Sequence, residues 1–120
     1  MSIKKFYRRR KPKKGIKSIK DSRPEHLTPQ YQTLVRYVKE RDKNRCQMPG
    51  CKKYRFGIEV HHIIRWNDNI QLRYDPNNCI CLCSAHHRVV TNNESVFALL
   101  FVQIVKANTL RYYTNNEYKK

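Results

Sequence analysis

The sequence is poor in acidic residues and has no apolar run long enough to cross a membrane. Nine Asp and Glu stand against 26 Lys and Arg, giving a formal net charge of +17 in 120 residues. Such an excess favours a polyanionic partner, because basic side chains that bind phosphates release counterions. The longest apolar-rich stretch, residues 96–105, is interrupted by Gln103 and suits a buried helix. We therefore expect nucleic acid and no membrane as the partner, although ribosome-associated proteins and proteins at anionic membranes share such basic tails.

Two further absences concern secretion and disulfides. The basic N-terminus lacks the apolar segment of a secretory signal, so we expect a cytoplasmic, non-secreted protein. The chain has five cysteines. This odd number argues against a fully paired disulfide scaffold and fits reduced thiols or zinc ligands. They are Cys46, Cys51, Cys79, Cys81 and Cys83.

Composition divides the chain into an arm and one domain, and no internal repeat is visible. Residues 1–26 hold eleven Lys or Arg and two acids with few core-forming residues, which predicts a flexible basic arm along phosphates. The same run would also pass for a nuclear-localisation patch. Residues 27–120 are left as a single domain, and a core of roughly 90 residues is marginal without a metal or an oligomeric interface.

Local patterns predict helices and short strands, hence an α+β domain. Apolar residues at helical spacing predict a helix over 29–42 that is capped by Thr28. The β-branched stretch "FGIEVHHII" and the run "CICLC" predict strands over 56–64 and 79–83. A helix is expected over 84–90, and Thr91 with Glu94 resembles the capping box of a last helix over 94–107 that is apolar on nearly every side.

Four candidate metal ligands occur in two closely spaced pairs, Cys46-x4-Cys51 and Cys83-x2-His86. Zinc takes four cysteine or histidine ligands in a closed tetrahedron, and short turns between paired ligands suit it. The pairs therefore predict a structural Cys3His zinc site, with buried free cysteines as the alternative. Cys81 competes with Cys83 for the ion, and we expect Cys79 and Cys81 to be core residues.

Two histidines that are adjacent in the sequence cannot both point to the same metal site. Neighbours on a helix project about 100° apart, so His87 should point away from the ion that His86 binds. Neighbours on a strand project to opposite faces, which separates His61 from His62. Three histidines outside the zinc pairs, in a chain charged for phosphate binding, favour phosphodiester hydrolysis assisted by a divalent ion.

The segments "EVHHII" and "DPNNCICLCSAHH", preceded by the Cys-x4-Cys knuckle, resemble the HNH endonuclease family over about residues 42–91. The similarity is to a zinc-stapled branch often found in bacteriophages and mobile elements. It implies a ββα-metal core with flanking helices in a bacterial or phage-infected cell. It further implies that DNA is cut to 5′-phosphate and 3′-hydroxyl ends.

The resemblance also implies roles for single residues. His62 matches the general base, His61 and His87 match the ligands of the catalytic ion, and Asn78 matches the asparagine that holds the base-bearing loop, with Asn77 as the alternative. Glu59 matches an orienting acid, and Cys46, Cys51, Cys83 and His86 match the structural zinc cluster. Magnesium is the default catalytic ion, with manganese, nickel and zinc as alternatives.

Other positions are expected to bind nucleic acid or a second copy of the chain. Where the family often has proline this chain has Arg65, and it departs again from a glycine-rich turn near "NDNIQL". One site cuts one strand, so double-strand cleavage would need a homodimer, for which the last helix is a candidate surface. A non-catalytic zinc-containing nucleic-acid-binding module is the competing hypothesis. The expected DNA contacts are Arg8, Arg9, Arg10, Lys11, Lys13, Lys14, Arg65 and Arg88.

Overall fold

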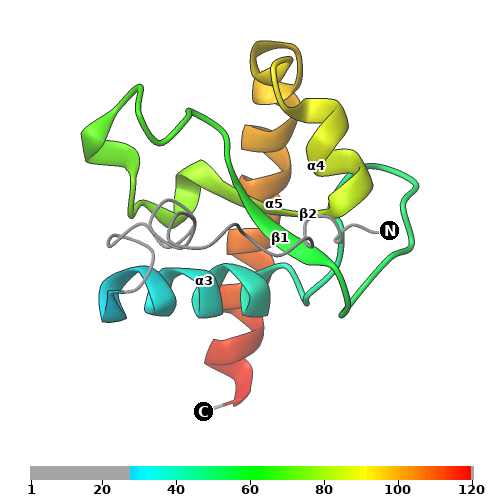
Figure 1. Cartoon of the computed structure of the whole chain (residues 1–120). Helices are drawn as coiled ribbons and strands as arrows, with labels where there is room; N and C mark the ends of the chain where they lie inside the picture. Colours follow the sequence, from blue (N-terminus) through cyan, green and yellow to red (C-terminus); the bar gives the residue numbers. More distant parts are fainter. Residues whose placement is uncertain (1–27, 120) are drawn as a thin grey trace, which may run out of the picture.

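The computed structural model describes residues 28–119, which form a small α+β domain. Two antiparallel strands, β1 (Ile58–His62) and β2 (Cys79–Cys83), make a hairpin that is followed directly by helix α4 (Ser84–Val90). Helix α3 (Pro29–Arg41) precedes this ββα unit, and the long helix α5 (Glu94–Lys119) follows it (Figure 1). The basic arm and its six expected DNA contacts lie outside the described residues.

Helix α3 begins and ends on local signals. The side chain of Thr28 accepts a hydrogen bond from the backbone N–H of Tyr31, and Pro29 occupies the first turn, where its missing N–H costs nothing. Leu34 and Val38 are buried and form the face that packs toward β2. The helix ends at Arg41, and Lys43 and Asn44 adopt positive φ immediately afterwards. The predicted helix and its cap are confirmed.

The hairpin carries the core of the domain. In its register Glu59 pairs with Leu82, His61 with Ile80 and His62 with Cys79. All of β2 is buried. Strand β1 is shorter than the predicted 56–64, because Gly57 adopts φ +70° and Phe56 before it is exposed. Between the strands, residues 63–78 form a long loop with the short 3-10 helices η1 (Ile70–Leu72) and η2 (Pro76–Asn78).

The predicted capping box at the start of α5 is wrong. The hydroxyl of Thr91 donates to the carbonyl of His87 at 2.8 Å, so Thr91 closes the end of α4. Asn92 then turns the chain with φ +75°, and the N–H of Val96 donates to the carbonyl of Asn93. Because its hydroxyl is bonded to α4, Thr91 does not cap α5. Helix α5 does begin at Glu94, as predicted.

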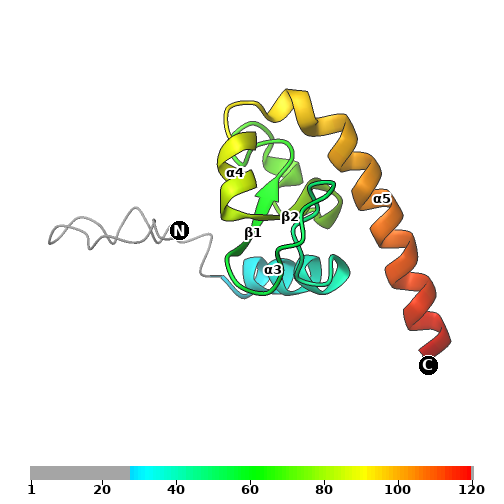
Figure 2. The ribbon, with the colours of Figure 1, turned by 90° about the vertical axis from the view of Figure 1, so that its right-hand side faces the viewer.

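Helix α5 continues well past the predicted end near residue 107 and runs along one side of the molecule (Figure 2). The apolar pattern stops there, but polar tertiary contacts continue the helix. Asn108, which is buried, donates from Nδ2 to Asp42 Oδ1 and to Gln47 Oε1, each at 2.9 Å. One turn later the ring of Tyr112 meets that of Tyr37 edge to face at 5.3 Å.

A buried carboxylate joins α3, β2 and α5. Asp42 accepts from Arg41 Nε at 2.8 Å, from the N–H of Cys81 at 3.0 Å and from Asn108. The guanidinium of Arg41 also donates to the carbonyls of Pro76 and Cys79. Every charged group in this junction is paired, as a buried ion pair requires.

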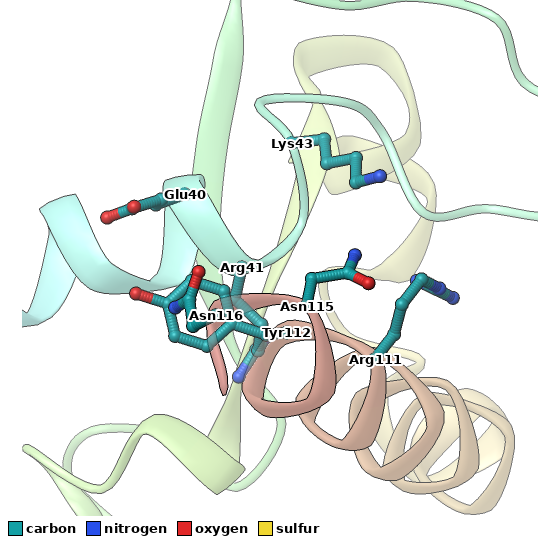
Figure 3. A pocket seen from close by; sticks show the side chains of 7 residues that line it. All are labelled: Glu40, Arg41, Lys43, Arg111, Tyr112, Asn115 and Asn116. Atoms are coloured by element: carbon teal, nitrogen blue, oxygen red, sulfur yellow. The ribbon is translucent and has the colours of Figure 1, made fainter. Parts of the chain in front are cut away.

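Two surface features complete the description. No helix among residues 28–119 is long and apolar enough to span a bilayer. A pocket of about 160 Å³ opens where the end of α3 meets α5, and Lys43, Arg111 and Asn115 are among the side chains that line it (Figure 3). None of the predicted site residues lines this pocket.

Candidate functional site

Four ligand atoms meet where the loop before β1 approaches the start of α4. The cluster consists of Cys46, Cys51, Cys83 and His86, whose candidate ligand atoms lie within 4.8 Å of one another. Cys83 ends β2, and His86 lies in the first turn of α4, three residues later. The strand end and the helical turn therefore present their side chains to the same point, opposite the turn that carries Cys46 and Cys51.

The geometry of this cluster fits a tetrahedral zinc ion. Nδ1 of His86 is 3.5 Å from Sγ of Cys46 and 3.4 Å from Sγ of Cys83. With Zn–S near 2.3 Å and Zn–N near 2.0 Å, a tetrahedral site has S···N edges of about 3.5 Å. Burial raises the pKa of the Cys46 thiol to about 12, so a cation is needed to hold this sulfur as a thiolate. The donor set and its spacing thus match structural zinc.

Cys79 and Cys81 lie outside this cluster. Both are fully buried in β2, and the thiol of Cys81 points to the carbonyl of Val38 at 3.8 Å. Burial raises the pKa of the Cys79 thiol to about 12, which keeps this thiol protonated in the core. Cys83, and not Cys81, therefore belongs to the metal cluster. Cys79 and Cys81 belong to the core.

On the other side of α4, His87 turns away from His86 and meets β1. Its ring lies edge to face with that of His61 at 5.3 Å between centroids. Nδ1 of His87 is 2.5 Å from Oε1 of Glu59, which is two residues before His61 on the same face of β1. Because a carboxylate accepts, Nδ1 carries the hydrogen in this pair and Nε2 is left as the ligand atom.

The burial of His61 sets its protonation state. Its side chain packs against Phe101 of α5, with ring centroids 5.8 Å apart, and only 5% of the residue is exposed. Desolvation and the neighbouring His87 lower the pKa of His61 from 6.5 to about 4. The imidazole is neutral near pH 7, which is the form that binds a metal ion.

His62 points to the opposite side of β1, into the loop of residues 63–78. Its Nε2 is 2.8 Å from the carbonyl of Arg73, and its ring meets Trp66 edge to face at 5.4 Å. A carbonyl only accepts, so Nε2 carries the hydrogen and Nδ1 holds the free electron pair. Burial lowers the pKa of His62, which keeps it available as a proton acceptor.

Asn78 fastens the loop that follows His62. Its Oδ1 accepts from the N–H of Ile64 at 2.9 Å, and its Nδ2 donates to the carbonyls of Ile64 and Leu72 at 3.0 and 3.3 Å. Asn78 is buried at the end of η2, directly before β2, whereas the neighbouring Asn77 is exposed. Asn78 therefore makes the contacts that the loop needs, and Asn77 does not.

The two arginines expected to contact DNA are exposed. Arg65 forms an ion pair with Asp68 at 3.1 Å, and both side chains are more than half exposed. Together with Glu94 they line a groove of about 510 Å³ between the loop after β1 and the start of α5. Arg88 lies on α4, one residue after His87.

Two contacts of the site have no simple sequence signal, whereas an exposed surface beside the zinc cluster has one. The carbonyl of Arg73 that receives the His62 hydrogen bond is a backbone group of an irregular loop. Phe101, which covers His61, was predictable only as a core residue of the last helix. The exposed aromatic residues Tyr54 and Phe56 follow Lys52 and Lys53 directly, and this basic and aromatic pattern was visible in the sequence.

Comparison with known proteins gives one match. Residues 39–92 match the sequence model of a family described as HNH endonuclease. No curated protein and no solved structure matches the chain. The matched segment begins in α3, includes the hairpin and α4, and ends before α5.

Proposed function

We propose that the chain, of which residues 39–92 match the HNH endonuclease family, is a metal-dependent endonuclease that hydrolyses DNA phosphodiester bonds. The observation that carries this proposal is the second histidine centre, formed by Glu59, His61 and His87 apart from the Cys3His cluster. A purely structural zinc module has no need of it. The net charge of +17 supports a polyanionic substrate.

In the proposed reaction His62 is the general base. Nε2 donates to the carbonyl of Arg73, so Nδ1 takes a proton from a water molecule. The resulting hydroxide attacks the phosphorus, the bond from phosphorus to the 3′ oxygen breaks, and the 3′ oxygen takes up a proton. The products are a 5′-phosphate and a 3′-hydroxyl end. Asn78 acts as a positioning residue that fixes the loop facing His62.

His61 and His87 would hold the catalytic divalent ion, for which magnesium is the first candidate. When bound, such an ion stabilises negative charge on the phosphoryl oxygens and the leaving oxygen. The residues fit this task because His61 is neutral and the Nδ1 of His87 is engaged by Glu59. Arg65 and Arg88 are proposed to bind phosphates of the substrate backbone. Arg65 would release its ion pair with Asp68 and bind a phosphate in its place.

The decisive experiment replaces the base. His62→Ala should lower the rate of divalent-ion-dependent nicking of a supercoiled plasmid about 100- to 10,000-fold. Gln71→Ala, an exposed position in the same loop, should leave the rate unchanged. Circular dichroism and zinc content should match the wild-type values for both variants. Full cleavage by purified His62→Ala would refute the assignment of the base, and an inactive wild type would favour the non-catalytic binding module.

A homodimer is proposed as the form that cuts both strands. The exposed side of α5 carries Val96, Leu99 and Leu110, each at least 70% exposed, along a stripe interrupted by Lys106. Apolar side chains in such a stripe are candidates for contact with a second copy. Light scattering at the concentration used for cleavage should give twice the mass of the chain, and a monomeric mass there would exclude this dimer.

A further inference from the structure

The loop before β1 presents a basic and aromatic surface that the proposed reaction does not use. Residues 43–57 contain five Lys and Arg and no acidic residue. Within this loop we define the knuckle patch as Arg45, Lys52, Lys53, Tyr54, Arg55 and Phe56. All six residues are exposed. Its four cations form no ion pair with the residues that the structure describes.

Aromatic rings and guanidinium groups alternate in the knuckle patch. Arg45 and Arg55 lie over the ring of Tyr54, at 5.1 and 5.3 Å from its centroid, and Arg55 lies 5.4 Å from that of Phe56. Tyr54 is 51% and Phe56 80% exposed. Because 80% of Phe56 is exposed, its ring can stack on a planar partner.

The backbone under the patch is fixed. The N–H of Cys46 donates to the carbonyl of Lys53 at 3.0 Å, and that of Arg55 donates to the carbonyl of Asn44 at 2.7 Å. Two zinc-cluster cysteines bracket the turn, and the N–H of Ser84 at the start of α4 donates to the carbonyl of Gly57. The exposed rings are therefore displayed by a rigid loop, which lowers the entropy lost on binding.

A comparison within the molecule shows that this exposure is not required by the fold. Arg73 lies over the ring of Trp66 at 4.9 Å, but there the ring is half-buried and Arg73 also donates to the carbonyl of Trp66. That pair closes the loop after β1. Phe56 has no such role, because its ring stands outside the core.

We propose that the knuckle patch binds a single nucleic-acid strand next to the cleavage site, with Phe56 stacked on an unpaired base and Lys52 and Lys53 on phosphates. Its chemistry is that of single-strand binding surfaces, in which a basic track contacts the backbone and aromatic rings stack on bases. The patch directly precedes β1, and His61 comes five positions after Phe56, so the histidine centre lies at most about 18 Å from a strand held there. The inference rests on the proposed nuclease function.

The test measures binding without catalysis. The full chain, with its zinc but without added divalent ion, is titrated into a fluorescent DNA single strand and into the same sequence as a duplex. Phe56→Ala should raise the Kd for the single strand about fivefold or more, and Phe56→Trp should restore it. The duplex Kd should stay within about twofold of wild type. Ile70→Ala, which removes an apolar side chain 72% exposed on η1, is the matched control.

The phosphate contacts are tested by salt. Joint replacement of Lys52 and Lys53 by Gln should flatten the dependence of log K on log salt for the single strand by about 0.7 per lysine. Arg36→Gln, which removes an exposed positive charge on α3, should leave it unchanged. An unchanged single-strand Kd in Phe56→Ala, an equal loss on duplex, or an unchanged salt slope overturns the proposal. Failure of the nuclease function alone would appear as absent cleavage with this binding pattern intact.

Discussion

His86 and His87 are neighbours in the sequence, yet they belong to two regions that are built differently. On the cysteine side, four ligand atoms converge on one point. On the histidine side, each ring is held by a separate partner: Glu59 for His87, Phe101 for His61 and the Arg73 carbonyl for His62. The first arrangement suits an ion that holds the fold together. The second holds three imidazole rings in fixed orientations.

The largest expected effect comes from breaking the cysteine side. Cys83→Ala should abolish zinc binding and unfold the domain, because structural zinc contributes on the order of 10 kcal/mol to small domains. Cys81→Ala removes an equally buried thiol outside the cluster and should keep the zinc, at a cost of about 1 kcal/mol. Zinc release by a chelator and chemical denaturation check both variants. Loss of zinc from Cys81→Ala would show that the two cysteines had been assigned the wrong way round.

Replacing His86 and His87 by alanine, one at a time, distinguishes the two regions. His87→Ala should lower divalent-dependent cleavage more than about 100-fold and leave zinc content unchanged, because it removes only a proposed ligand of the catalytic ion. His86→Ala should lower zinc affinity and stability first, with cleavage falling only as the protein unfolds. Cleavage rates are compared at a temperature where His87→Ala is fully folded. Equal zinc loss in both variants would mean that the two histidines share one ion.

The smallest effect concerns acid. The unfolded chain protonates His61 near its ordinary pKa of 6.5, whereas the folded chain does so only near 4. Between these values the unfolded state binds more protons, so the free energy of unfolding falls as the pH is lowered from about 6.5 to 4 and then levels off. The loss should be on the order of 3 kcal/mol. Denaturation of wild type and His61→Asn, without added divalent ion, measures it as their difference, and parallel pH profiles would contradict it.

Sequence reasoning succeeded where the signal was local. The Thr28 cap, the strand "CICLC" and the spacing of Cys83 and His86 depend on residues a few positions apart, and each was found. It failed where distant groups decide. Thr91 lies between two helices, and its hydroxyl bonds to the end of α4 and not to the start of α5. The C-terminal extension of α5 depends on the hydrogen bond from Asn108 to Asp42, 66 residues away in the sequence.

The candidate site shows the same division. Alternation on a strand and the turn angle of a helix were enough to separate His61 from His62 and His86 from His87. The spacing to His86 already favoured Cys83 over Cys81, and the structure adds that Cys81 contacts Asp42 and Val38 instead. The free nitrogen of His62 was beyond sequence reasoning, because a backbone carbonyl determines it.

The buried carboxylate of Asp42 bears on how the segment that matches the family, residues 39–92, could be transplanted. Residues 39–92 include Asp42 and His61. Their partners belong to α5: Asn108 donates a hydrogen bond to Asp42, and Phe101 covers the ring of His61. A chimera that carried the matched segment alone would expose the His61 ring and remove a donor from a buried charge. The smallest portable unit therefore extends through α5 at least to Asn108, and a donor scaffold would have to supply a helix with an equivalent amide and aromatic ring.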